Sequence, residues 1–283
     1  MNRYGKLKYI FFYLLIFSHC FSSENKPLLK IHGYNVYSQW GEDGIIEKIF
    51  QIIGTESKNC IEFGATEGIY FSNTANLWKH KNWKAILIES NPKHYSSLMS
   101  NTKGSQCICL IEKIGISETD SLEHHLSQIN FDEPIDLLSI DIDGNDYYVL
   151  NTLKHLRPRV IICEYNPSFP AHMNIFSKLN NFSGCSVGAL NRVARKKGYT
   201  LICITDTNCF YINDNELEKF YDYDLSLESM RIDKYLKYVV TDYRGNYKII
   251  GTKDSKTPYG FKKPTTEEFF GDVKCYENLN ITN

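Results

Sequence analysis

The sequence predicts an α/β protein whose core is a doubly wound, mostly parallel sheet of seven strands with the last strand antiparallel. Apolar segments of strand length alternate with helical segments, and this serial order requires parallel strands joined by right-handed crossovers. The final two apolar segments follow each other directly, so they pair as antiparallel neighbours. A chain of 283 residues with 42% hydrophobic side chains can bury a sizeable core around such a sheet.

The first clear element is a helix over residues 42–54. Isoleucines and Phe50 fall on one helical face, acids stand at the start, and Gly54 closes the helix. Pro92 suits the first turn of the third helix, and Ser121 and Ser186 suit the N-caps of later ones. The expected strands are 59–65, 83–89, 105–111, 135–141, 159–165, 200–206 and 208–214, and the expected further helices are 73–80, 91–99, 121–129, 146–156 and 186–198.

Three regions follow from this pattern. Residues 1–22 read basic, then apolar, then small and polar, which is typical of a signal peptide or an N-terminal anchor. Residues 23–214 form the α/β domain with a helical lead-in. Residues 215–283 form a C-terminal extension that we expect to fold on the main domain as an edge hairpin or lid, with a hairpin that turns at Arg244 to Asn246.

The leader and the cysteines indicate different compartments. The leader predicts export through a secretory pathway, with membrane anchoring as a variant, but its apolar run is short of the roughly 20 residues that cross a bilayer. Most of the nine cysteines fall within apolar strand segments, where they resemble small buried hydrophobes. That usage favours a reducing compartment, so a cytoplasmic location stays the alternative.

The balance of acidic and basic side chains limits the classes of binding partner that the sequence favours. With 32 basic and 33 acidic side chains the formal net charge is -1, so no global field favours a nucleic-acid partner. We therefore expect a small-molecule or carbohydrate ligand and no nucleic acid. The sequence does not determine the oligomeric state.

A glycine loop follows the first predicted strand. Glu62 ends the strand, and Gly64 and Gly68 bracket the turn into the next helix. Because only this outer pair is present, the loop lacks the three glycines of a dinucleotide-binding fingerprint. About 20 residues further on, Glu89 ends the second strand, where an acid accepts hydrogen bonds from ribose hydroxyls. The pattern favours a nucleoside without a pyrophosphate.

The order of several motifs is similar to one family. The segments "YSQWGEDGIIEKIF", "CIEFGATEG", "NTANLW", "AILIE", "DLLSIDIDGNDYYVL" and "VIICEYN" run in an order that resembles the FkbM-like, class I S-adenosylmethionine-dependent methyltransferases, over roughly residues 37–212. The resemblance implies a Rossmann-like fold and S-adenosylmethionine as cofactor. Thr66 stands where class I enzymes more often have glycine.

The resemblance also assigns cofactor contacts. It places the Glu62 to Gly68 loop at the methionine end and Glu89 on the ribose. The segment ahead of the first strand forms the rim of the cofactor or substrate site, although helix capping explains Glu42 and Asp43 equally well. The implied cofactor-binding residues are Gln39, Glu62, Gly64, Ala65, Gly68, Glu89 and Asp141.

Two carboxylates end neighbouring predicted strands and carry the expected chemistry. Asp141 follows the fourth strand, and Glu164 with Asn166 follows the fifth. One hypothesis is that these three hold Mg²⁺ or Mn²⁺, which activates an acceptor hydroxyl. The other is that Asp141 or Glu164 removes the hydroxyl proton directly as a general base. His172, in the long loop beyond, is a further candidate base.

We therefore expect an O-methyltransferase that acts on a hydroxyl of a small-molecule or sugar-like acceptor. Two alternatives remain from the sequence. The "DIDG" motif, with Asp143 and Asp146 shaping its turn, resembles the nucleophile loop of haloacid-dehalogenase-type phosphatases, although those enzymes carry it on the first strand. An exported, non-catalytic binding protein on a methyltransferase frame is the other alternative, which the leader motivates.

Overall fold

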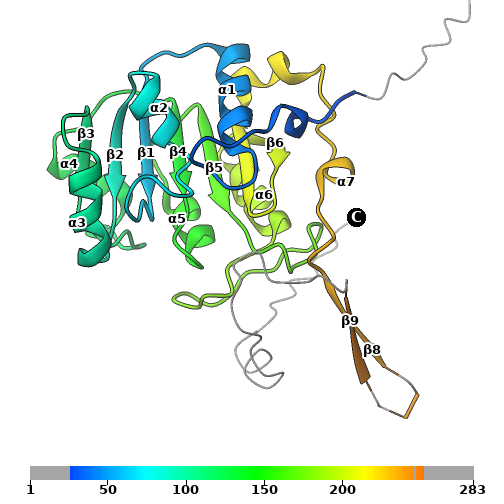
Figure 1. Ribbon diagram of the computed structural model, residues 1–283. Helices are drawn as coiled ribbons and strands as arrows, with labels where there is room; N and C mark the ends of the chain where they lie inside the picture. Colours follow the sequence, from blue (N-terminus) through cyan, green and yellow to red (C-terminus); the bar gives the residue numbers. More distant parts are fainter. Residues whose placement is uncertain (1–25, 242, 245–246, 252–283) are drawn as a thin grey trace, which may run out of the picture.

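A computed structural model describes residues 26–241, 243–244 and 247–251 of the chain (Figure 1). The predicted signal peptide, residues 1–22, lies outside the described residues and stays a prediction. Within the described part, no helix combines the length and the apolar character that crossing a membrane requires.

The main sheet has seven strands in the order β3-β2-β1-β4-β5-β7-β6 (Figure 1). All neighbouring pairs are parallel except those of β7, which runs antiparallel to both β5 and β6. The predicted doubly wound sheet with an antiparallel last strand is confirmed. Its strands are β1 (Asn59–Phe63), β2 (Lys84–Ile88), β3 (Cys107–Leu110), β4 (Leu137–Ile140), β5 (Val160–Glu164), β6 (Tyr199–Ile204) and β7 (Asn208–Asn213).

Helices cover both faces of this sheet. One buried apolar cluster joins one face to α1, α2 and α3, and a second joins the other face to α4, α5 and α6. The short helix η2 and the 3₁₀ helix η1 pack on the α1 side. The bounds are η1 (Leu29–His32), α1 (Glu42–Ile53), α2 (Ala75–His80), α3 (Pro92–Asn101), α4 (Leu122–Gln128), α5 (Asp146–Thr152), α6 (Val187–Lys196) and η2 (Asp214–Phe220).

The helix starts follow the predicted caps. The Ser121 hydroxyl accepts a hydrogen bond from the backbone of His124, and that of Ser186 accepts one from Ala189. One boundary is wrong in the sequence prediction, because α5 ends at Thr152 and not at residue 156. The next backbone N–H groups, at 154–156, donate instead to one carboxylate oxygen of Glu123, so they leave the helical hydrogen-bond pattern.

The amino ends of the central strands meet at a buried charge cluster. Asp136 is fully buried and accepts hydrogen bonds from three successive backbone N–H groups, at residues 56–58. Arg159 donates to the same carboxylate at 3.1 Å and also pairs with Glu216 of η2. This cluster joins the amino ends of β1, β4 and β5 to the C-terminal extension. It lies opposite to the carboxyl ends of these parallel strands.

The first part of the C-terminal extension packs on the domain, and the hairpin that follows projects from it (Figure 1). Phe220 of η2 is fully buried. Asp206, in the β6–β7 turn, pairs with Lys30 on one side and with Lys234 and Tyr235 of the extension on the other. After α7 (Leu227–Met230), strands β8 (Lys237–Thr241) and β9 (Tyr247–Gly251) form a separate antiparallel hairpin that does not join the main sheet (Figure 1).

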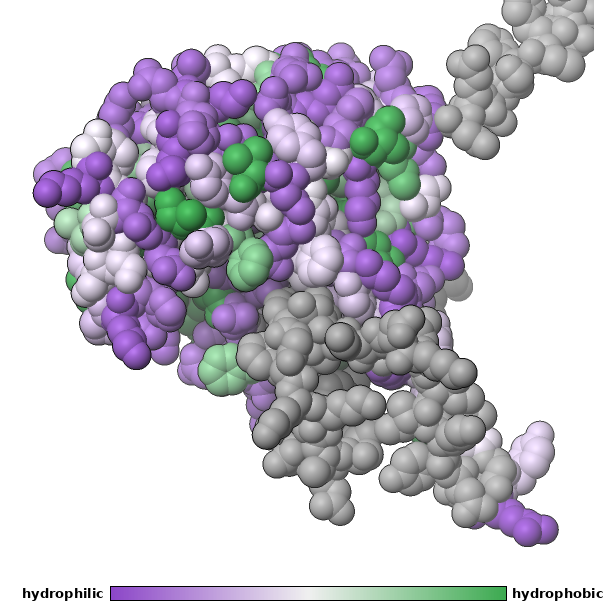
Figure 2. Space-filling model, viewed as in Figure 1, coloured by the Kyte–Doolittle hydropathy of each residue, from purple (hydrophilic) through white to green (hydrophobic). Residues whose placement is uncertain are grey.

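The surface and the thiols are unexceptional. Figure 2 shows a face that is mostly hydrophilic with scattered apolar side chains. The seven cysteines that the structure describes are all free thiols, and most of them are buried, as the strand pattern predicted.

Candidate active site

The sheet has its topological switch point between β1 and β4, since the chain winds outward from β1 through β2 to β3 and then crosses to β4. Ligands of doubly wound sheets bind outside the carboxyl ends of the strands at this point. Gly64 follows β1 with φ +72°, and a Cβ added there would lie 1.6 Å from the backbone carbonyl oxygen of Asp141. Only glycine therefore permits the two strand tips to approach this closely.

The turn after Gly64 is fixed by Glu89 at the end of β2. The backbone N–H of Thr66 donates to one Glu89 oxygen at 2.8 Å, and that of Asn91 donates to the other at 2.6 Å. Thr66 has φ +47°, a strained conformation for a β-branched residue. Ala65 continues the ladder by donating to Ile88, so the loop is held against β2. Each Glu89 oxygen keeps a further lone pair for the predicted ribose contact.

Glu62 takes part in a buried hydrogen-bond network beside this turn. Its carboxylate accepts hydrogen bonds from the Ser72 hydroxyl at 2.6 Å, the Asn73 backbone at 2.7 Å and the Thr74 hydroxyl at 2.6 Å. Burial raises the pKa of Glu62, and these bonds oppose the rise. Glu62 thus orders the segment that leads into α2, a role that its strand-end position alone did not reveal.

Two further acidic residues, Glu42 and Asp43, lie at the start of α1. One oxygen of Asp43 accepts hydrogen bonds from the backbone N–H groups of Val36, Tyr37 and Ser38 and ties down the preceding loop. Its other oxygen is buried without a partner in the described part of the chain. The charge of Asp43 adds slightly to the raised pKa of Glu62, which burial causes in the first place.

Beside α1, three polar groups that the sequence did not single out surround Glu42. Its carboxylate accepts hydrogen bonds from the Thr205 hydroxyl at 2.8 Å and from the Trp40 backbone at 2.6 Å. Asn208 donates to the same carboxylate at 3.4 Å. The carboxamide oxygen of Asn208 and the indole nitrogen of Trp40 are buried without partners among the described residues. Gln39 is half-buried at the same rim.

Asp141 and Glu164 lie at the tips of adjacent parallel strands, because Ile140 of β4 pairs in register with Cys163 of β5. Their carboxylates share a hydrogen bond. Burial raises the pKa of Asp141 to about 8, the nearby charges of Asp146 and Asp143 add to the rise, and the bond with Glu164 opposes it. The raised pKa of Asp141 favours its protonated form near neutral pH.

Asp143 and Asp146 divide the roles that the "DIDG" turn suggested. Asp146 accepts hydrogen bonds from the backbones of Ile142 and Gly144, both at 2.9 Å, and so shapes the turn as predicted. Asp143 is exposed, and one of its oxygens lies within 4.8 Å of oxygens of both Asp141 and Glu164. The motif follows β4, the fourth strand along the chain, in the middle of the sheet. The phosphatase alternative would need this motif after the first strand, so the structure argues against it.

Two other predicted residues occupy the loop beyond β5. The carboxamide oxygen of Asn166 accepts a hydrogen bond from the Ser168 backbone at 2.9 Å, and its nitrogen donates to the Ser183 carbonyl at 2.8 Å. The Asn166 side chain thus holds together the two ends of the loop. The oxygen donor that accompanies Asp141 and Glu164 is Asp143. His172 is exposed, and no hydrogen bond or ion pair among the described residues joins it to Asp141 or Glu164.

Comparisons with known proteins agree with this architecture. Residues 112–201, from the loop after β3 into the start of β6, match the family model of the methyltransferase FkbM domain. No curated protein sequence matches the chain.

Several solved structures are similar at low identity. A TehB-like SAM-dependent methyltransferase from Corynebacterium glutamicum has 10% identity and a TM-score of 0.35 over 65% of this chain and 92% of its own. A SAM-dependent methyltransferase from Aquifex aeolicus has 11% identity and a TM-score of 0.34 over 59% and 87%. The N-terminal domain of EvdMO1 with SAH bound has 10% identity and a TM-score of 0.38 over 60% and 79%. The fold assignment rests on the strand order itself.

The family match spans the strand tips that carry Asp141 and Glu164, and the sheet around them has the expected strand order. Over residues 112–201 the chain is similar to the methyltransferase FkbM domain, and this match supports a methyltransferase.

Proposed function

We propose that the chain transfers a methyl group from S-adenosylmethionine to a hydroxyl of a small-molecule or sugar-like acceptor. The observation that carries this proposal is the hydrogen-bonded pair of Asp141 and Glu164 at the switch-point edge of the sheet. A hydroxyl is a poor nucleophile near neutral pH, and the pair offers a carboxylate oxygen that can accept its proton.

The residues present fit S-adenosylmethionine. The turn from Gly64 to Gly68 brings backbone close to the strand tips without a pyrophosphate fingerprint. The unpartnered oxygen of Asp43, buried beside Glu62, suits an ammonium group such as that of the methionine end. Glu89 would accept hydrogen bonds from the ribose hydroxyls, because each of its oxygens accepts one backbone hydrogen bond and has a further lone pair. When bound, the cofactor supplies an activated methyl group.

The chain's own residues then prepare the acceptor. In the transfer the acceptor oxygen would bond to the methyl carbon as the carbon–sulfur bond of the sulfonium breaks and S-adenosylhomocysteine is released, and the hydroxyl proton would pass to a carboxylate of the Asp141–Glu164 pair. The buried, unpartnered carboxamide oxygen of Asn208 supports this placement, because Asn208 stands opposite Glu164 in the β5–β7 register and can accept a hydrogen bond from a second hydroxyl. Fixing both ends of a polyol orients it before reaction.

A divalent cation is the second form of the proposal. Oxygens of Asp141, Asp143 and Glu164 lie within 4.8 Å of one another, and three such donors suit Mg²⁺ or Mn²⁺. A cation held there would lower the pKa of the acceptor hydroxyl in place of a general base. Asp143 replaces Asn166 of the predicted ligand set, because the Asn166 side chain is engaged within its own loop.

The test is methyl transfer from labelled S-adenosylmethionine to a panel of alcohols, sugars, amines and thiols. Transfer to hydroxyls, lost by at least about 100-fold in Asp141→Asn with cofactor binding retained, supports the proposal. Transfer confined to amines or thiols overturns the hydroxyl assignment, and full turnover in Asp141→Asn overturns the role of the pair. Unchanged turnover in chelator excludes the cation form, whereas loss that Mg²⁺ restores supports it.

A further inference from the structure

The loop between β5 and α6 is built as a hairpin. Phe176 and Cys185 pair as an antiparallel β-bridge, and the Ser177 backbone N–H donates to the Gly184 carbonyl at 2.9 Å. Figure 1 shows this loop running below α5, past the carboxyl ends of the strands. We call residues 178–183, which connect the two sides of the hairpin, the loop tip.

The loop tip is fixed to the acidic turn that follows β4. A Cβ added at Gly144 would lie 2.3 Å from the Asn181 carbonyl oxygen and 3.1 Å from the Cα of Phe182, so the two backbones touch here. The Asn145 carboxamide donates to that of Asn180 at 3.1 Å, and the Asn180 backbone N–H donates back to the Asn145 carboxamide oxygen at 2.7 Å. The tip therefore has a defined position next to the turn that carries the acids of the site.

This fixed tip holds Phe182 in solvent. The Phe182 side chain is 89% exposed, and that of Leu179 on the same tip is 38% exposed. Single exposed apolar side chains are common on protein surfaces. Phe182 differs because its backbone is in contact with Gly144, the residue directly after Asp143. A ligand at the acidic turn would thus meet an aromatic side chain on backbone that is already ordered, so little further ordering opposes the contact.

A hollow of about 230 Å³ opens beside the loop tip. Asn145 lines it from the acidic turn, Asn180 lines it from the tip, and the loop between β3 and α4 lines the other side. Its apolar lining consists of Ile114, Ile116, Val149 and Leu179. An apolar cavity of about 150 Å³ is enough to bind benzene, so a short alkyl chain or a ring fits this volume.

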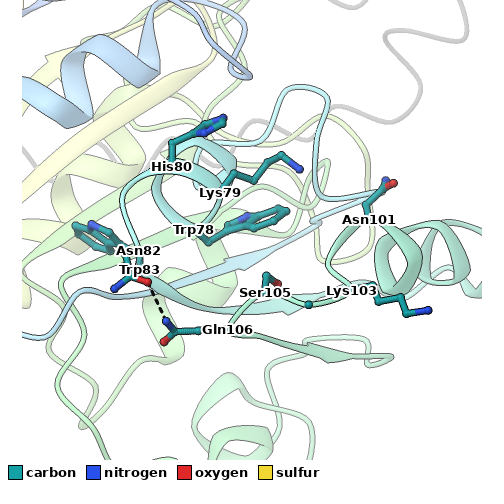
Figure 3. A pocket seen from close by; sticks show the side chains of 10 residues that line it. Trp78, Lys79, His80, Asn82, Trp83, Asn101, Lys103, Ser105 and Gln106 are labelled. Carbon is teal, nitrogen blue, oxygen red and sulfur yellow. Dashed lines mark hydrogen bonds between the residues drawn. The ribbon is translucent and has the colours of Figure 1, made fainter.

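The hollow at the opposite end of the strands has a different character (Figure 3). It has about 360 Å³ and lies between the ends of α2 and α3, next to the amino ends of β2 and β3. Most of its lining is polar, and Figure 3 shows the Lys103 side chain directed away from Trp78 and Lys79. An apolar group near the acids of the site therefore finds its partners at the loop tip.

We propose that the acceptor of the methyl group is an amphiphile, whose alkyl chain or ring packs on Phe182 and Leu179 and enters the hollow beside the loop tip while its hydroxyl faces Asp141. Asn145 of the hollow follows Asp141 by four residues, so their Cα atoms are at most about 14 Å apart. One small amphiphile can span that distance. The inference rests on the proposed function, because it names the class of acceptor for that site.

The test compares methyl glucoside with octyl glucoside, which share a head group and differ in the length of the chain. Both are assayed as acceptors from labelled S-adenosylmethionine, with octyl glucoside kept below the concentration at which it forms micelles. The wild-type KM is expected to be at least about tenfold lower for octyl glucoside, because the chain leaves water. Phe182→Ser is expected to raise this KM about tenfold with little change in kcat, and Leu179→Ser by a few-fold.

Tyr221→Ser is the matched control. Tyr221 is an aromatic residue that is 54% exposed, and it follows η2, whose Glu216 pairs with Arg159 at the amino ends of the strands. This variant is expected to keep the wild-type KM for both glucosides. All three substitutions replace exposed side chains, so the variants are expected to fold.

A binding measurement separates this inference from the proposed function. Octyl glucoside is titrated calorimetrically into the full chain saturated with S-adenosylhomocysteine. Binding that Phe182→Ser weakens about tenfold supports the apolar site even without methyl transfer, and in that case the hydroxyl assignment alone fails. Equal affinity for the two glucosides, or a Phe182→Ser variant that behaves like Tyr221→Ser, overturns the inference.

A third arm identifies the source of the amphiphile. Glucosylceramide in phosphatidylcholine vesicles replaces the dissolved glucoside as acceptor. Transfer to the vesicles that depends on Phe182 supports the inference with a lipid surface as the source, whereas transfer to dissolved octyl glucoside alone supports it with a free amphiphile. If octyl glucoside does not bind at millimolar concentration and neither compound is methylated, the inference is overturned.

Discussion

Gly64 is the residue whose replacement most directly tests the close approach of β1 and β4. In Gly64→Ala the new Cβ would meet the Asp141 carbonyl oxygen at 1.6 Å and its carbon at 2.9 Å, and both atoms belong to backbone that cannot rotate away. The residue also has φ +72°, which costs an L-residue about 1–2 kcal/mol. Forcing the strand tips apart adds about 1–3 kcal/mol.

Gly54 is the matched control. It has φ +70°, nearly the same as Gly64, but nothing lies within 4 Å of the Cβ that alanine would add. Gly54→Ala therefore carries the conformational cost alone, which is about 1–2 kcal/mol because φ +70° with ψ 174° is a conformation that is essentially confined to glycine. We expect Gly64→Ala to lower the free energy of unfolding by about 3–4 kcal/mol and Gly54→Ala by about 1–2 kcal/mol.

The assay is urea unfolding at neutral pH, followed by tryptophan fluorescence, with calorimetric titration of S-adenosylmethionine on both variants. Gly64→Ala is also expected to lose cofactor affinity at least about tenfold, because the turn from Gly64 to Gly68 is the proposed cofactor contact, whereas Gly54→Ala keeps it. Equal unfolding free energies for the two variants, together with equal cofactor affinity, would show that the Gly64–Asp141 contact does not constrain the site.

Two further predictions concern charges away from the site. Asp136→Ala removes the acceptor of three backbone N–H groups and of Arg159, and should lower the free energy of unfolding by about 3–5 kcal/mol; a loss below about 1 kcal/mol in urea unfolding would contradict this. For Asp206, burial raises the pKa, but hydrogen bonds from Lys234 and Tyr235 outweigh it, so the pKa is lowered in the folded protein. Its stabilisation is therefore complete above the unfolded value, about 4, and is lost as pH falls through the lower folded value. Asp206→Asn should lower the free energy of unfolding by about 1–3 kcal/mol at pH 7. Urea unfolding should show that the difference in this free energy between variant and wild type disappears only in acid. A difference that grows in acid would contradict the lowered pKa of Asp206.

Local patterns were enough to predict most of the fold. Strand and helix order, the caps at Ser121 and Ser186, and the antiparallel last strand follow from periodicity and capping chemistry. The pairing of Asp141 with Glu164 was also predictable, because parallel neighbouring strands end at the same edge. The end of α5 was not predictable, because Glu123 of α4 accepts hydrogen bonds from the backbone N–H groups that follow α5.

The parts of the site that the sequence did not predict depend on contacts between distant segments. Asn208 reaches Glu42 from 166 residues away, and no local pattern marks either side chain as a partner of the other. The resemblance assigned Glu62 to the cofactor, which stays a prediction, and the structure adds hydrogen bonds to Glu62 from the Ser72–Thr74 segment. A signal for this network was present in the run of small polar residues before α2, whose hydroxyls need an acceptor once buried.

Asp206 has a consequence for synthesis on the ribosome. The segment that begins the described chain depends on residues made much later, because Lys30 pairs with Asp206 and the Pro27 carbonyl accepts the Asp224 backbone N–H. A nascent chain stalled before β6 therefore lacks the ion-pair and hydrogen-bond partners of this segment, and only the packing of η1 on α1 is left to hold it. We expect such stalled chains to be cleaved there by added protease, and completed chains to resist cleavage at the same bonds.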